Sequence, residues 1–171
     1  IGIVGSKLLF PNGTIQHASV VIVETPSGKL GNHIYWGFPG SFKQVNIARD
    51  YQVVTAACML IPRDLFFSAN AFDERYINGM EDVDLCLKVR NLGKRVFYCP
   101  TSVLTHFESK TPGRFDKINE NERLFIRLWD NKIEADINKY LIKDGYRIEY
   151  TDEKTSWKYH EELFQKLLTV I

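Results

Sequence analysis

The feature that most constrains the fold is that every apolar run in the chain is short. The longest covers residues 53–61, far below the ~20 apolar residues that a membrane helix needs. A run of this size, bounded by turn residues, is typical of a buried strand. Similar runs predict strands at Ile1–Phe10, Thr14–Glu24, Tyr51–Ile61, Lys94–Cys99 and Ser102–Thr105. The first two are separated by Pro11-Asn12-Gly13, residues that suit a tight turn.

Helical patterns alternate with these strands. In Glu81–Leu92 the residues Val83, Cys86, Leu87 and Arg90 recur at i, i+3, i+4 and i+7, and Gly93 follows as a stop. Further helices are predicted at Arg63–Ala69, Asn119–Trp129 and Ser156–Val170. Strands and helices in alternation predict an α/β fold.

Length and charge exclude several functions. The chain has 171 residues, which fits one domain with a real core, because domains most often hold ~100–150 residues. With 22 basic and 21 acidic residues the net charge is +1, so no basic footprint indicates nucleic acid as a partner. From Asn131 the composition shifts to Lys, Glu, Asp and Tyr. We therefore divide the chain into a body at 1–130 and a helical C-terminal extension at 131–171.

The three cysteines, Cys58, Cys86 and Cys99, are an odd number and form no Cys-x-x-Cys. Each has apolar neighbours, so we interpret them as small buried side chains with free thiols. Free thiols fit a reducing compartment, and we predict a cytoplasmic location, with the inner face of the membrane compatible with it.

The densest chemistry lies at the start of the predicted helix at 81–92. Glu81, Asp82 and Asp84 place three carboxylates within four residues, directly after Gly79, which allows a tight turn. Acidic residues are common in the first turn of a helix because the positive end of the helix dipole stabilises their negative charge. A carboxylate at this junction can equally face a cleft and act as a general base or metal ligand. Spacing alone leaves both interpretations open.

Two further segments carry candidate residues. His106 stands at the end of a predicted strand, where it is either a metal ligand or an ordinary hydrogen-bonding residue. The polar stretch from Ser109 to Arg114 suits a diphosphate through hydroxyl and guanidinium donors, or is simply a soluble loop. His17, His33 and His160 lack partners at metal-ligand spacing, and we interpret them as structural.

The Gly- and Pro-rich stretch Thr25–Gly40 contains Tyr35, Trp36 and Phe38. A long aromatic loop of this kind is usually functional or forms a lid. Trp36 is a candidate platform on which a sugar ring stacks, and an aromatic plug over the sheet is the alternative.

The order of these pieces strongly resembles the C-terminal half of glycosyltransferase family 2 enzymes, especially the rhamnosyltransferase-like branch. The resemblance covers about Val4 to Trp129 and rests on an ordered series of segments. They are Lys7–Ala18, Val54–Arg63, Ala71–Tyr76, Glu81–Lys88, Arg95–Pro100 and His106–Ser109.

The resemblance implies a GT-A fold, a Rossmann-like α/β sandwich with a mixed sheet. It also implies an inverting transfer of a sugar from a nucleotide-sugar donor to a saccharide or glycan acceptor, in the synthesis of surface polysaccharides. Asp82 matches the catalytic base, and Glu81 would position the acceptor or hold the loop. Asp84 would serve the helix.

Other matched positions imply binding roles. His106 matches a histidine that reaches the divalent metal, Mg or Mn, or the diphosphate. Thr55, Ala56 and Ala57 match the segment bordering the donor sugar, with Ala in place of the usual Gly. We add Trp36, Gly79 and Arg114 as substrate-binding candidates.

The resemblance has one large departure. The family's N-terminal half binds the nucleotide and carries the aspartate pair that holds the metal, and nothing in this sequence matches it. Because the first residue is Ile1, in an apparent strand, we expect a piece of a longer enzyme, inactive alone, whose nucleotide half lies in the parent chain or a partner.

Two other functions remain as alternatives. One is a non-catalytic carbohydrate-binding or interaction module with a degenerate transferase fold. The other, a sugar nucleotidyltransferase, is disfavoured because the sequence holds no Gly-rich phosphate loop.

Overall fold

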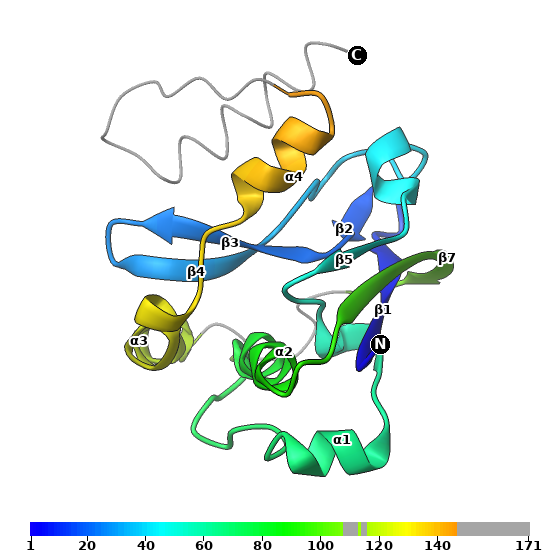
Figure 1. The fold of residues 1–171 in the computed structure, drawn as a ribbon. Helices are drawn as coiled ribbons and strands as arrows, with labels where there is room; N and C mark the ends of the chain where they lie inside the picture. The colour runs from blue at the N-terminus through cyan, green and yellow to red at the C-terminus, as the bar shows by residue number, and fades with distance from the viewer. Residues whose placement is uncertain (108–112, 114–115, 147–171) are drawn as a thin grey trace.

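The computed structural model describes residues 1–107, 113 and 116–146 and has a mixed α/β fold (Figure 1). Its larger sheet has five strands in the order β2-β1-β7-β5, with β6 paired to β1. These strands are β1 (Ile3–Leu9), β2 (Ile15–His17), β5 (Arg49–Tyr51), β6 (Met59–Leu60) and β7 (Val96–Thr105). The central pair, β1 and β7, is parallel, whereas β2, β5 and β6 pair antiparallel to their neighbours. The predicted α/β class and mixed sheet are confirmed.

Strand β7 corrects the prediction of two strands separated by Pro100. The structure has one strand, and its register against β1 shifts between Ser6 and Lys7, which pair with Cys99 and Val103. Pro100 falls within that irregularity. Proline is tolerated at such a bulge because no ladder hydrogen bond is required of its missing N–H.

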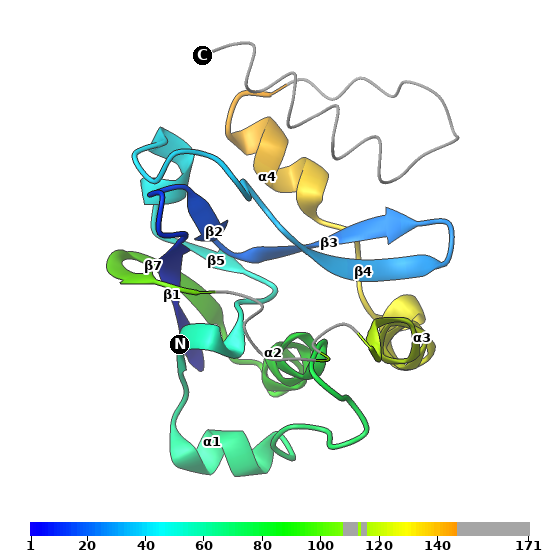
Figure 2. The same cartoon turned by 180° about the vertical axis from the view of Figure 1, so that it is seen from behind.

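A separate two-stranded sheet is formed by β3 (Val20–Thr25) and β4 (Gly28–His33). Strand β4 lies where we predicted a loop, so that part of the prediction for 25–40 is wrong. The hairpin lies between α4 (Ile137–Lys143) on one face and α2 (Glu81–Asn91) with α3 (Ile118–Trp129) on the other (Figures 1 and 2). The short helix α1 (Arg63–Ser68) lies beyond α2.

The predicted strand at 51–61 is largely wrong. Only its ends, in β5 and β6, are strand, and the segment between them bends through a 3-10 turn at Ala56–Cys58. Thr55 caps this turn by accepting a hydrogen bond from the Ala57 backbone N–H. Two further 3-10 turns lie at Lys43–Asn46 and Asp130–Lys132.

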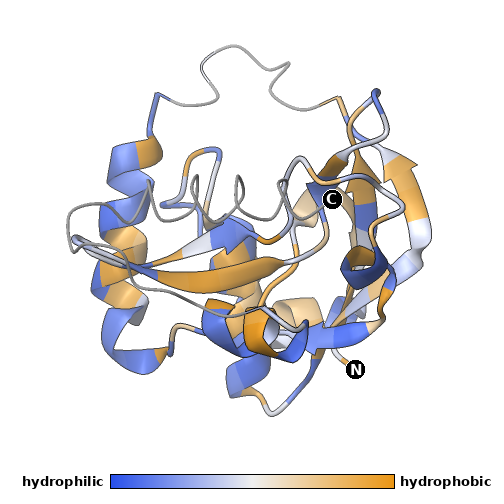
Figure 3. Ribbon diagram, turned by 90° about the horizontal axis from the view of Figure 1, so that it is seen from above, coloured by the Kyte–Doolittle hydropathy of each residue, from blue (hydrophilic) through white to orange (hydrophobic). Residues whose placement is uncertain are grey.

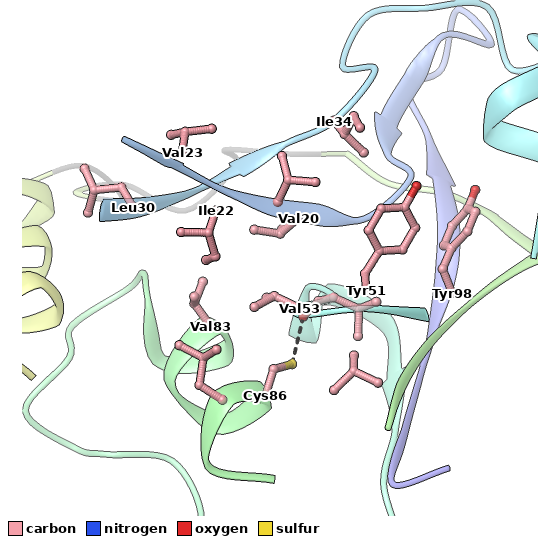
Figure 4. Packing of buried hydrophobic residues seen from close by; sticks show 14 of the residues in the cluster. Val20, Ile22, Val23, Leu30, Ile34, Tyr51, Val53, Val83, Cys86 and Tyr98 are labelled. Atoms are coloured by element: carbon pink, nitrogen blue, oxygen red, sulfur yellow. Dashed lines mark hydrogen bonds between the residues drawn. The ribbon is translucent and has the colours of Figure 1, made fainter. Parts of the chain in front are cut away.

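The core fills the space between the hairpin and α2. Val20 and Ile22 of β3 face Val83 and Cys86 of α2, with Val53 between them (Figure 4). The Cys86 thiol donates a hydrogen bond to the Val54 carbonyl at 3.4 Å and is fully buried, as predicted. Cys58 and Cys99 are free as well, but both are partly exposed.

Helix α3 is amphipathic, with hydrophilic and hydrophobic residues alternating along it (Figure 3). Its last residue, Trp129, donates from Nε1 to the Asp84 carboxylate at 2.8 Å, while Lys88 pairs with the other Asp84 oxygen at 2.6 Å. Asp84 is buried. This acidic residue therefore joins α2 to α3.

The aromatic stretch after β4 is mostly core. Tyr35 and Phe38 are buried, and the Tyr35 hydroxyl donates to Asp144, just after α4. Arg49 of β5 pairs with the same carboxylate at 3.0 Å, and both charged side chains are almost wholly buried. Tyr35, Arg49 and Asp144, which we call the Asp144 triad, connect the end of α4 to the sheet.

Helix α4 belongs to the segment that we assigned to a C-terminal extension. The boundary near residue 130 stays a prediction, and the predicted helix at 156–170 lies outside the described residues. None of the described helices combines the length and the apolarity that crossing a membrane requires.

Candidate active site

The loop that leads into α2 has an unusual backbone. Asn78, Gly79 and Met80 have φ angles of 58°, 152° and 71°. Positive φ is uncommon for non-glycine residues such as Asn78 and Met80, and backbone strain of this kind is often found at functional sites. The Glu81 carboxylate turns back to accept the Gly79 N–H at 2.7 Å. The first acidic residue of the cluster therefore holds the loop.

Asn121 of α3 holds the same loop from the other side. Its side-chain oxygen accepts the Ile77 N–H at 3.0 Å, and its amide nitrogen donates to the Ile77 carbonyl at 2.7 Å. The Asn121 side chain is buried. Both backbone groups of Ile77 are thereby satisfied by one residue of a distant helix.

Asn121→Ala is expected to lower the free energy of unfolding by about 2 kcal/mol, because two partly buried backbone groups lose their partner. Amide hydrogen exchange at Ile77 and Gly79 should accelerate as the loop loosens. Urea titration and exchange mass spectrometry measure both effects. The matched control is Arg123→Ala on the exposed side of α3, and equal behaviour of the two variants would contradict this role for Asn121.

Asp82 is fixed by three hydrogen bonds. Its Oδ2 accepts the Thr55 hydroxyl at 2.9 Å and the Ala56 N–H at 3.0 Å, and its Oδ1 accepts the Val83 N–H at 2.9 Å. These bonds explain why the predicted strand at 51–61 is broken at this point. The turn at 56–58 brings one backbone donor, the Ala56 N–H, to the carboxylate, beside the side-chain hydroxyl of Thr55.

Asp82 lies on the wall of a pocket of about 260 Å³ between α2, α3 and the β3–β4 hairpin. Four of the predicted site residues line it: Thr55, Gly79, Glu81 and Asp82. The remaining walls are formed by Val20, Gly31, His33, Asn78, Met80, Val83, Ile118 and Asn121. A larger hollow of about 560 Å³, bordered by α4 and the end of α2, contains none of the predicted residues.

Two histidines lie at this pocket: His33 lines it directly, and His17 is connected to it through Thr55. His17 is completely buried on β2, and its Nε2 accepts the Thr55 N–H at 3.4 Å. Its Nδ1 lies 3.0 Å from Nδ1 of His33, which lines the pocket. Burial, with the nearby charges of His33 and His106, lowers the pKa of His17 well below its ordinary value. The buried site therefore favours the uncharged form of the His17 ring.

His106 follows β7, and its backbone N–H donates to the Leu9 carbonyl at 2.8 Å. Its ring Nδ1 lies 3.2 Å from the Gln16 side-chain oxygen. Within the described ranges, no three His, Cys, Asp or Glu side chains are grouped so that they could hold a metal ion. The described residues therefore do not form a complete metal site, and the ligand role of His106 stays a prediction.

The other predicted residues lie in different places. Ala56 contributes its backbone N–H to Asp82, and Ala57 is exposed with its N–H on the Thr55 hydroxyl. Trp36 is 49% exposed and packs edge-on against Phe10, with ring centroids 5.6 Å apart. It does not line the pocket of Asp82. Arg114 lies outside the described residues.

The sequence reasoning missed the involvement of His17 and His33. Neither has an acidic neighbour in the sequence that would draw attention to it. The pairing of Val20 with His33 in the hairpin could have indicated that His33 lies close to the end of β2 and to His17. This pairing was not predicted, because β4 was not recognised as a strand.

Sequence comparison finds relatives that are much longer than this chain. It is 36% identical over 128 residues to the uncharacterized protein y4gI of Sinorhizobium fredii, which covers 72% of this chain and 14% of the relative. It is 38% identical over 125 residues to the O-antigen biosynthesis protein RfbC of Myxococcus xanthus, covering 70% of this chain and 10% of that protein.

A shorter match joins the chain to an N-acetylglucosaminyl-diphospho-decaprenol L-rhamnosyltransferase of Mycobacterium tuberculosis. It is 34% identical over 61 residues, covering 36% of this chain and 20% of the relative. No family model matches the chain. The names of these relatives support the resemblance to sugar-transferring enzymes, whereas membership of glycosyltransferase family 2 stays a prediction.

Proposed function

We propose that this chain is the acceptor-side part of an inverting glycosyltransferase that acts in the synthesis of surface polysaccharides. The observation that carries the proposal is the Asp82 carboxylate, fixed on the wall of a pocket by the Thr55 hydroxyl and the Ala56 N–H. The printed names of two relatives, an O-antigen biosynthesis protein and an L-rhamnosyltransferase, support it.

In the proposed reaction, Asp82 acts as general base. Its Oδ1 accepts one hydrogen bond from the described residues, from Val83 N–H, and therefore retains a lone pair for a proton. An acceptor hydroxyl in the pocket gives its proton to Asp82, and its oxygen forms a bond to the anomeric carbon of the donor sugar. The bond from that carbon to the nucleoside diphosphate breaks, and its electron pair leaves with the diphosphate. Attack opposite the leaving group inverts the anomeric configuration.

The remaining pocket residues have supporting roles in this proposal. Glu81 keeps the loop at 78–80 in its strained form through the Gly79 N–H, and that loop forms one wall of the acceptor site. Thr55 orients Asp82. Preorganised groups of this kind lower the barrier because they need no rearrangement during the reaction.

The experiment uses the full-length protein that contains this chain. Transfer is measured by mass spectrometry with a panel of UDP-, GDP- and dTDP-activated sugars and lipid-linked or free N-acetylglucosamine acceptors, with Mg²⁺, with Mn²⁺ and with EDTA. We expect transfer of one sugar with inversion, and its loss in EDTA would bear out the predicted metal requirement. Saccharide binding without any transfer or nucleotide binding would instead favour a carbohydrate-binding module.

A further inference from the structure

The loop at 78–80 presents a polar side chain to the pocket that the described part of the protein does not use. The Asn78 carboxamide lines the pocket of Asp82, is exposed there, and makes no hydrogen bond to a described residue. Its backbone is nevertheless fixed on both sides, since Asn121 binds the preceding residue and Glu81 binds the following one. Asn78 therefore holds a carboxamide at the pocket wall, available to a ligand.

The other neutral polar side chains of the described walls are already engaged. Both polar atoms of the Asn121 side chain bind the loop, and the Thr55 hydroxyl donates to Asp82. His33 lies in hydrogen-bond contact with His17. Of these groups, the Asn78 carboxamide is the one left to offer a ligand both a donor and an acceptor.

The rest of the pocket is partly apolar and partly acidic. Its apolar lining residues are Val20, Met80, Val83 and Ile118. Glu81 and Asp82 supply carboxylate oxygens, and neither Lys nor Arg is among the described lining residues. A sugar ring matches these walls, because its C–H groups form an apolar face and its hydroxyls can donate along the edge. An anionic group would instead meet like charge, which is costly in a binding site.

The size of the pocket limits how much of a saccharide it can enclose. Its volume of about 260 Å³ is below the ~300 Å³ at which pockets for drug-sized ligands begin. We therefore expect it to enclose a single ring and to leave the rest of a glycan outside.

We propose that this pocket binds one uncharged sugar ring of the acceptor and that Asn78 recognises it. The carboxamide oxygen accepts from one hydroxyl, and the carboxamide N–H donates to the adjacent hydroxyl. The inference rests on the proposed function, because it names the acceptor class of the same pocket. The hydroxyl that reacts is a different one, at Asp82, so Asn78 contributes to acceptor binding and not to the chemical step.

The first arm of the test removes the carboxamide and keeps the backbone. Glycine readily adopts the φ of 58° found at Asn78, so Asn78→Gly does not strain the loop. In the full-length protein we expect the acceptor KM to rise about tenfold, the usual weight of one hydrogen bond, with kcat and the donor KM near wild type.

Asn70→Gly is the matched control for this variant. Asn70 has a φ of 60°, is exposed, and does not line the pocket, so the same backbone change there should leave the acceptor KM at the wild-type value. An equal rise in both variants, or no rise in Asn78→Gly, would overturn the role of Asn78.

The second arm tests the class of sugar and needs no transfer. Saturation-transfer NMR with the full-length protein at low salt compares methyl glycosides of glucose, galactose, mannose, L-rhamnose and N-acetylglucosamine with the matching glucuronide and galacturonide. We expect saturation of C–H protons of a neutral sugar, weaker saturation of the uronides, and a loss in Asn78→Gly that Asn70→Gly does not show. Stronger saturation of the uronides would overturn the uncharged class.

The two proposals can fail separately. If the wild type transfers sugar but Asn78→Gly has the wild-type acceptor KM, the assignment of Asn78 is wrong and the proposed function stands. If no transfer is found, the NMR decides. Saturation of a neutral sugar that falls only in Asn78→Gly supports the sugar site without the transferase function, whereas no saturation, or no difference between the variants, rejects it.

Discussion

Asp82→Asn should reduce the rate of sugar transfer by about 10²–10⁴-fold, which is the range for loss of a general base. The amide cannot take up the proton of the acceptor hydroxyl. It also cannot accept on both sides, so one of the donors now on Asp82, either the Thr55–Ala56 pair or the Val83 N–H, loses its acceptor. Steady-state transfer by the full-length protein measures the rate, and calorimetry with the nucleotide-sugar checks that donor binding survives.

The matched control is Asp73→Asn. Asp73 lies in the connection between α1 and α2, outside the helix that carries Asp82, and Arg75 pairs with its carboxylate at 2.6 Å and lowers its pKa to about 2. It does not line the pocket, and we expect transfer to stay near the wild-type rate. A wild-type rate for Asp82→Asn would remove Asp82 from the role of base.

Asp144→Ala should lower the free energy of unfolding by about 3 kcal/mol, because it leaves a buried guanidinium without its partner. Arg49 pairs with Asp144 at 3.0 Å, with both side chains nearly inaccessible to solvent, and the Tyr35 hydroxyl donates to the same carboxylate. Burial and this hydrogen bond raise the pKa of Tyr35. Arg49 and Tyr35 therefore both depend on one carboxylate, and urea denaturation followed by circular dichroism measures its contribution.

Asp50→Ala provides the comparison for that loss. Asp50 pairs with Arg95 at 3.0 Å, but these side chains are about half exposed, and exposed ion pairs contribute little. The difference between the two variants isolates the effect of burial. Equal destabilisation would mean that the Asp144 triad is not the anchor of α4.

Helices α1, α2 and α3 could be predicted from sequence because their signals are local, whereas α4 at Ile137–Lys143 was not predicted. Glu81–Leu92 and Asn119–Trp129 differ from α2 and α3 by one residue at an end, since apolar periodicity and a terminal glycine act within a few residues of each other. The turn at 11–13 was also correct. Gly13 has a φ of 83°, and the Asn12 side chain accepts the Thr14 N–H.

The strands were harder to predict, because whether a segment forms a strand depends on partners that are distant in the sequence. Gly28–His33 contains two glycines and no β-branched residue, so its strand propensity is low, yet it pairs with β3 along its whole length. Val53–Cys58 has the composition of a strand, but Asp82 draws the backbone at Ala56 into a turn. In both places a contact distant in sequence overrides local preference.

Only part of the candidate site could be predicted, because some of its residues are brought together by contacts that are distant in sequence. The carboxylates and Thr55 belong to recognisable segments, and the structure brings them into one pocket. His17 and His33 meet only because β2 and β4 end near Thr55, and no spacing rule relates residues 17, 33 and 55. Trp36 was a candidate only because it is an aromatic residue in a predicted loop, and it lies outside the pocket.

The parallel pairing of β1 with β7 has a consequence for how this chain is made. Residues 3–9 find their central partner only at residues 96–105, so a ribosome must synthesise most of the body before the sheet can close. The β3–β4 hairpin has a local partner and can form far earlier. Contacts so distant in sequence slow folding and leave strand edges exposed. During translation the side of β1 that pairs with β7 therefore has no partner until residues 96–105 have been made, whereas β1 can pair with β2 and β6 earlier.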